Sequence, residues 1–99
     1  MDWFTIKNID AIDSPALVIY KDRVIENIQL LKGMVEGKVE QLRPHVKTNK
    51  IVEVCSMMLD GGITKFKCAT IAEAEMLAMI KAPDVLLSYQ PVGPKAKRL

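Results

Sequence analysis

Four ionisable side chains lie close together in the segment Arg43-Pro44-His45-Val46-Lys47-Thr48-Asn49-Lys50. The apolar residues around them predict a buried strand over residues 40–47, where charge is costly unless it serves a purpose. Alternate residues of a strand point to opposite faces, so Arg43, His45 and Lys47 share one face. In a parallel barrel this polar face would line the interior, and we therefore take it as the candidate catalytic face.

Lys47 is the residue of this face with the most useful chemistry. It stands at the C-terminal end of the predicted strand, the end at which barrels and doubly wound sheets build active sites. Desolvated there beside Arg43 and a charged His45, its amine would favour the neutral form that attacks a carbonyl and forms a Schiff base. Lys50 is the weaker candidate, because it falls in the first turn of the next predicted helix.

The same pattern also fits a simpler structure. Arg43, His45 and Lys47 would share a solvent-facing side if the strand lay at the edge of a sheet, as Pro44 suggests because it has no N–H for a ladder. His45 also fits a structural residue, or a hydrogen-bond partner that orients the lysine.

The rest of the chain predicts a regular alternation of strands and helices. Predicted strands cover residues 16–20, 40–47, 65–69 and 84–89. Apolar residues at helical spacing predict helices at 22–35, 51–59 and 70–81; the capping box Thr70-Ile71-Ala72-Glu73 opens the last of these, and Pro94 opens a further helix. Such alternation implies an α/β fold with a parallel sheet and right-handed crossovers.

Two architectures share this rhythm, an open doubly wound sheet and a closed (β/α)8 barrel of about 250 residues. Four strands cannot close such a barrel, so we expect residues 1–99 to form the N-terminal half of one, within a longer protein. A complete four-stranded α/β domain is the alternative.

Composition excludes several classes of protein. With 49% hydrophobic and 26% charged residues the chain resembles soluble globular domains, and a net charge of +2 is too balanced to indicate nucleic acid as a partner. No apolar run approaches the roughly 20 residues that span a membrane, and no secretory signal is visible, so we expect a cytoplasmic protein. Cys55 and Cys68 are then expected to be buried thiols rather than a disulfide or a metal pair.

The segment Arg43-Pro44-His45-Val46-Lys47-Thr48-Asn49-Lys50 resembles the R-P-H-x-K-T-H-K signature of the D-threonine aldolase and D-serine dehydratase group, in the alanine racemase N-terminal-domain superfamily of fold type III pyridoxal-phosphate enzymes. The segments 13–18, 67–75 and 88–93 resemble other parts of the same family, so the resemblance covers about residues 12–95. One residue departs from the signature, because Asn49 stands where these members usually have histidine. Lysine followed by x-Asn is similar to the K-x-N pattern of alanine racemases.

The resemblance implies a (β/α)8 barrel that binds pyridoxal phosphate through a Schiff base on Lys47. From its place on the same face we also expect His45 to contact the cofactor. The ligands of a divalent metal and the C-terminal β-domain of the family would lie outside this chain, whose own residues predict no metal site. The implied activity is that of an amino-acid lyase, an aldolase or a dehydratase, in a protein that commonly forms homodimers. The isolated chain is expected to have little activity.

Three other functions stay open at this point. A racemase of the alanine racemase type would use the same lysine to exchange the α-proton of an amino acid. A non-catalytic protein of pyridoxal-phosphate homeostasis would bind the cofactor without breaking a bond. A small α/β interaction module would carry solvent-facing charges and no cofactor.

Overall fold

The computed structural model describes residues 2–99, in which helices and strands alternate from residue 52 onward. Its helices and strands are α1 (Lys21–Met34), α2 (Val52–Asp60), β1 (Lys65–Cys68), α3 (Ile71–Met79), β2 (Asp84–Leu87) and α4 (Pro94–Arg98). Short 3-10 turns occupy Ile9–Ala11, Val39–Gln41 and Val46–Thr48. The α/β class predicted from the sequence is therefore confirmed, with a smaller sheet than expected.

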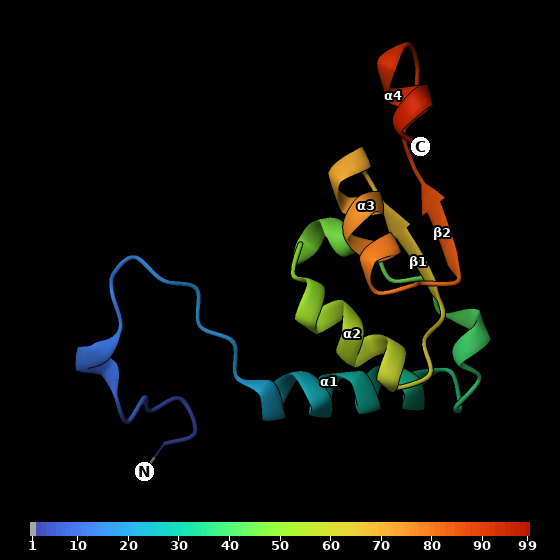
Figure 1. Cartoon of the computed structure of the whole chain (residues 1–99). Helices are drawn as coiled ribbons and strands as arrows, with labels where there is room; N and C mark the ends of the chain where they lie inside the picture. The colour runs from blue at the N-terminus through green and yellow to red at the C-terminus, as the bar shows by residue number, and fades with distance from the viewer. Residues whose placement is uncertain (1) are drawn as a thin grey trace.

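The sheet is parallel, as the alternation of elements predicts. β1 pairs with β2 in a register that runs from Lys65 opposite Asp84 to Cys68 opposite Leu87, and α3 forms the crossover between them (Figure 1). On the other side of β1, His45 forms a single parallel bridge with Lys67. The segment that ends at His45, β1 and β2 therefore lie side by side, in chain order.

The strand predicted over residues 40–47 is only partly present. The main-chain N–H of Lys67 donates to the Pro44 carbonyl at 2.9 Å, but one bridge is the whole ladder between the two segments. Two 3-10 turns, Val39–Gln41 and Val46–Thr48, take up the ends of the predicted strand. Pro44 contributes to this outcome, because a proline has no N–H with which to extend a ladder.

The strand predicted over residues 16–20 is wrong for this structure. Leu17, Val18 and Ile19 are exposed, and no ladder includes them. Figure 1 shows residues 2–20 extending away from the helices and the sheet. An apolar run becomes a stable strand only when a neighbouring strand pairs with it and its faces are covered, and the described residues provide neither here.

The extended N-terminal segment is anchored at the start of α1 by aromatic contacts. The ring of Trp3 meets the rings of Phe4 and Tyr20 edge to face, and the Arg23 guanidinium lies 4.2 Å from the centre of the Trp3 ring. The Tyr20 hydroxyl donates to the Phe4 carbonyl at 2.6 Å. The described chain has a radius of gyration of 16.0 Å, above the roughly 13 Å of a globular domain this long, which the outlying segment accounts for.

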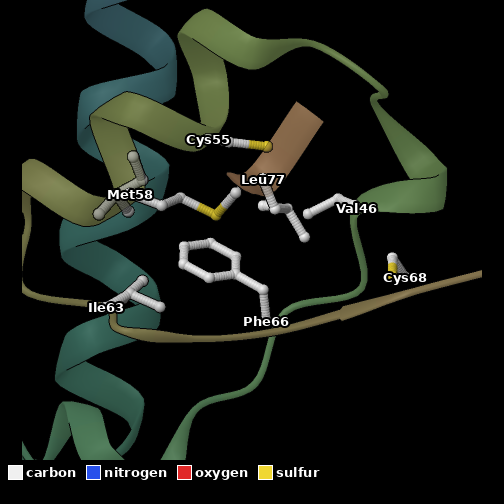
Figure 2. Packing of buried hydrophobic residues seen from close by; sticks show 8 residues of the cluster. Val46, Cys55, Met58, Ile63, Phe66, Cys68 and Leu77 are labelled. Atoms are coloured by element: carbon white, nitrogen blue, oxygen red, sulfur yellow. The ribbon is translucent and has the colours of Figure 1, made fainter. Parts of the chain in front are cut away.

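The core lies between one face of the sheet and the helices. Figure 2 shows the Phe66 ring of β1 surrounded by Met58 of α2, Leu77 of α3, and Ile63 from the connection between α2 and β1. The helical stripes predicted from the sequence are confirmed, since Ile28, Cys55 and Met58 all face this cluster. The buried apolar residues are Ile28, Val46, Cys55, Met58, Ile63, Phe66, Cys68, Ile71 and Leu77.

The predicted helix ends are also present. The Thr70 hydroxyl accepts the Glu73 N–H at 3.1 Å, which is the first half of the expected capping box, and Pro94 opens α4. After α2 the chain turns at Gly62, whose φ of 94° is open to glycine and strained for other residues. Within residues 2–99, none of the helices combines the length and apolar character needed to cross a bilayer.

Candidate functional site

Lys47 lies just beyond the point where three parallel segments end. The segment that ends at His45 is parallel to β1, and β1 is parallel to β2. The C-terminal ends of all three segments therefore lie at the same edge of the sheet. Lys47 follows His45 in the 3-10 turn Val46–Thr48. The structure thus brings this lysine to the C-terminal ends of the strands, the edge at which parallel sheets hold their ligands.

The turn that carries Lys47 is fixed by local contacts. The Nδ1 atom of His45 accepts the main-chain N–H of Lys47 at 3.3 Å, and the Thr48 hydroxyl donates to the His45 carbonyl at 3.1 Å. Val46, fully buried, anchors the middle of the turn in the core. The backbone of Lys47 is therefore held while its side chain is exposed. His45 thus contacts the main chain of Lys47, and its role toward the lysine side chain stays a prediction.

Two expectations about the surroundings of Lys47 are corrected by the structure. The side chain is exposed rather than desolvated, because the chain leaves the sheet at His45 and no described element covers the turn. Arg43 does not lie beside it. Arg43 Nη1 donates to the Phe66 carbonyl at 3.0 Å and to Asp84 Oδ1 at 2.7 Å, at the opposite end of the sheet.

The register explains the position of Arg43. Two residues before the bridge between His45 and Lys67, Arg43 falls level with Lys65, and Lys65 pairs with Asp84. Four residues of extended chain span about 13 Å, so a side chain in this row cannot also accompany Lys47. The shared face of Arg43 and His45 is nevertheless confirmed, since it lies opposite the face on which Val46 and Phe66 are buried.

The Arg43 and Asp84 ion pair predicts an acid-sensitive component of stability. The hydrogen bond from Arg43 holds the pKa of the Asp84 carboxyl below its ordinary value, and the positive charges of Arg43 and Lys65 add to this effect. The same hydrogen bond raises the pKa of Arg43. Because the carboxyl has a lower pKa in the folded chain, the pair stabilises the fold above about pH 3.9, and this stabilisation is lost as the pH falls through the lowered pKa.

Replacing Asp84 with asparagine should therefore lower the urea midpoint near pH 6 and leave little difference from the wild type at about pH 2. The measurement is urea unfolding followed by circular dichroism at both pH values. Asp10→Asn is the matched control, because Asp10 is exposed and makes no ion pair among residues 2–99. An equal pH dependence in the two variants would contradict the assignment.

A second set of polar contacts lies at the same edge of the sheet as Lys47. The Glu73 side chain is buried, and its Oε1 atom accepts the Ala69 N–H at 3.0 Å, just after β1. Its Oε2 atom lies 3.9 Å from the Nζ atom of Lys50. The capping-box pattern predicts the role of Glu73 at its helix, but the contact with Lys50 depends on the tertiary fold and is not visible in the sequence.

Asn49, the residue that departs from the family signature, has a local structural role. Its Oδ1 atom accepts the Ile51 N–H at 2.9 Å, in a turn that leads into α2, and lies 3.9 Å from the Cys55 sulfur. Both cysteines are free and buried, and burial raises the pKa of each thiol. Within residues 2–99 no group of three His, Cys, Asp or Glu side chains is placed to hold a metal ion.

A depression of about 430 Å³ lies at the same edge, over the segments that follow β1 and β2. Its walls include Thr70, Ile71, Tyr89 and Gln90, and Lys47 is not among the residues that line it.

The residues around Lys47 fit an aldehyde cofactor in one respect that the structure shows directly. The amine is exposed on a fixed turn, and no carboxylate within residues 2–99 lies at ion-pair distance from it.

Comparison with known proteins gives two matches. The family described as alanine racemase, N-terminal domain, matches residues 19–98. D-threo-3-hydroxyaspartate dehydratase from Delftia sp. (strain HT23) is 35% identical over 75 residues, which cover 76% of this chain and 20% of that protein. The chain thus spans about a fifth of the length of this curated relative. No solved structure matches the chain significantly.

Proposed function

The chain belongs to the alanine racemase N-terminal-domain family, and we propose from this premise that it supplies the cofactor-binding lysine of a pyridoxal-phosphate-dependent amino-acid lyase. The barrel of this family has eight strands, and we assign residues 1–99 to its first half. The relative named as a dehydratase supports a lyase that removes water from a 3-hydroxy amino acid over one that cleaves a carbon–carbon bond.

The observation that carries the proposal is the placement of Lys47. Its amine is exposed at the C-terminal ends of three parallel segments, on a turn whose backbone His45 and Val46 hold in place. When bound, pyridoxal phosphate supplies an electron sink that stabilises negative charge at the α-carbon of an amino acid. Lys47 would hold the cofactor through a bond from its Nζ atom, and His45 is the second residue that we assign to the cofactor.

The bridge between His45 and Lys67 supports the assignment of Lys47 and His45 to the cofactor. It joins the segment before the Lys47 turn to β1 through a main-chain hydrogen bond between Lys67 and Pro44. A lysine whose backbone is held reacts with less loss of conformational freedom than one on a mobile loop. Any metal site, the contacts to the cofactor phosphate and a homodimer interface would come from other parts of the protein.

A racemase is the second candidate function. Lys47-Thr48-Asn49 has the K-x-N form, and the family that matches residues 19–98 carries the name of that enzyme. A racemase would exchange a proton at the α-carbon and leave the rest of the amino acid intact, whereas a dehydratase would release ammonia and a keto acid. Incubating the longest gene product with D-3-hydroxyaspartate and D-alanine, and measuring both products, separates the two candidates.

The proposed cofactor site is tested by trapping. The chain is mixed with pyridoxal phosphate, its absorbance is recorded, and borohydride is added before peptide mapping. We expect an absorbance band at about 420 nm, as for a protonated lysine adduct of this cofactor. After borohydride reduction, we expect the cofactor to be attached to Lys47. A label spread evenly over the exposed lysines would overturn the proposal and favour an interaction module without a cofactor.

A further inference from the structure

The lysine segment carries two amines three residues apart, and the structure places them in different surroundings. Lys47 and Lys50 are both exposed, so accessibility alone does not select one of them as the reactive amine. Among the described residues, Lys50 has an ionic partner and Lys47 has none, since the Lys50 Nζ atom lies 3.9 Å from the Oε2 atom of Glu73. Within residues 2–99, no carboxylate approaches Lys47 as closely.

Glu73 is held rigidly in its place. It is 5% exposed, and a carboxylate this buried needs hydrogen bonds or a cation to offset its lost hydration. The Ala69 N–H meets its Oε1 atom at 3.0 Å, and its own N–H donates to the Thr70 hydroxyl at 3.1 Å. These contacts leave Oε2 as the oxygen that faces Lys50.

Lys50 is held from its own side as well. Its N–H donates to the Val46 carbonyl at 2.9 Å, and its φ of 56° lies in the left-handed region that a lysine seldom adopts. The backbone of Lys50 is therefore not helical, and α2 begins two residues later at Val52. The Glu73 carboxylate and the Lys50 main chain are therefore held by contacts independent of the ion pair.

We propose that Glu73 is a positioning residue that engages the Lys50 amine in an ion pair, so that Lys47 is the amine of this segment that reacts with an aldehyde cofactor. This inference rests on the proposed function. Attack on an aldehyde needs an amine that is free to approach the carbonyl carbon, and the ion pair holds the Lys50 amine against Glu73. In the reaction, the lysine nitrogen bonds to the aldehyde carbon and the aldehyde oxygen leaves as water.

The test measures how a label divides between the two lysines. Wild type, Glu73→Gln and Glu75→Gln are each treated with pyridoxal phosphate and then with borohydride, whose hydride reduces the new carbon–nitrogen double bond. Cleavage after acidic residues yields the peptide of residues 41–53, in which Lys47 and Lys50 are the only lysines. Fragmentation of this peptide gives the ratio of the two labelled species.

Glutamine at residue 73 retains an oxygen that can accept the Ala69 N–H and removes the charge. Glu75 is a matched control, because it lies on the same helix and pairs with Arg98 at 2.7 Å, but is exposed. We expect the ratio of Lys50 to Lys47 label to rise about two- to fivefold in Glu73→Gln, as for loss of one partly exposed ion pair, and to stay constant in Glu75→Gln. An unchanged ratio in Glu73→Gln, or an equal rise in both variants, would overturn the inference.

A second measurement needs no variant and covers the case in which Glu73→Gln fails to fold. Salt screens a pair whose lysine is 64% exposed, so raising the sodium chloride concentration from about 0.05 to 0.5 M should increase acetylation of Lys50 relative to Lys47 in the wild type. A constant ratio would overturn the inference. Failure of the proposed function looks different, because neither lysine would then exceed Lys95 and Lys97 in pyridoxal-phosphate label.

Discussion

Replacing Lys47 with alanine should lower the amount of pyridoxal phosphate that borohydride traps in the peptide of residues 41–53 about tenfold. The reason is the arrangement described above, in which Lys47 is the exposed amine of this peptide without a carboxylate partner among the described residues. A tenfold preference corresponds to about 1.4 kcal/mol, a modest demand on an accessible amine whose backbone is held. The measurement is the mass-spectrometric yield of labelled peptide against an internal standard.

Two control variants distinguish the chemistry of Lys47 from its charge and from damage to the fold. Lys47→Arg keeps a positive charge but cannot form the bond, so its label should fall as far as that of the alanine variant. Lys50→Gly removes the neighbouring amine at a residue whose φ of 56° suits glycine, and the label on Lys47 should persist. A Lys47→Arg variant that is still labelled in this peptide would place the reactive amine at Lys50.

The helices and the position of the candidate lysine could be predicted from the sequence because they depend on local patterns. The apolar stripe of α1 and the capping box at Thr70 specify where a helix begins and which side it buries, whatever lies elsewhere in the chain. The same is true of strand parity, which places Arg43 and His45 on the face opposite Val46. These features need only the spacing of residues along one element.

The predictions from the sequence are wrong where the structure depends on contacts between residues that are distant in the sequence. Residues 16–20 have the composition of a buried strand, but a strand also needs a neighbour for its main-chain groups, and none of the described residues pairs with them. Arg43 was expected beside Lys47, but its place is set by the register with Lys65, which aligns it with Asp84. Neither a register nor an absent neighbour can be derived from one segment alone.

The contact between Lys50 and Glu73 also depends on residues that are distant in the sequence. Twenty-two positions of the sequence separate the two residues, and each has a sufficient local interpretation, as a lysine in the signature and as a capping glutamate. Only the bridge between His45 and Lys67, which brings the lysine segment next to β1, places the start of α3 within reach of Lys50. The fold thus adds a structural difference between the two lysines, of which the resemblance already implies Lys47 as the cofactor lysine.

The second large effect is expected in the core that supports this edge of the sheet. Phe66 is fully buried on β1, and Figure 2 shows its ring between Met58, Ile63 and Leu77. Replacing it with alanine should lower the free energy of unfolding by about 3–5 kcal/mol, from lost apolar burial and the cavity left behind. That is a large share of the roughly 5–15 kcal/mol of an ordinary domain, so we expect the variant to be mostly unfolded at 37 °C.

Urea unfolding followed by circular dichroism measures this loss, with Leu86→Ala as the matched control. Leu86 lies on β2 in the same sheet but is 50% exposed, so its truncation should cost about 1 kcal/mol or less. The comparison also links the core to the site, because Phe66 precedes Lys67, whose N–H holds the Lys47 segment against β1. Phe66→Ala should therefore lose the selective label on Lys47 along with its fold, while Leu86→Ala retains both; equal losses in the two variants would mean that the sheet does not pack through the face that carries Phe66.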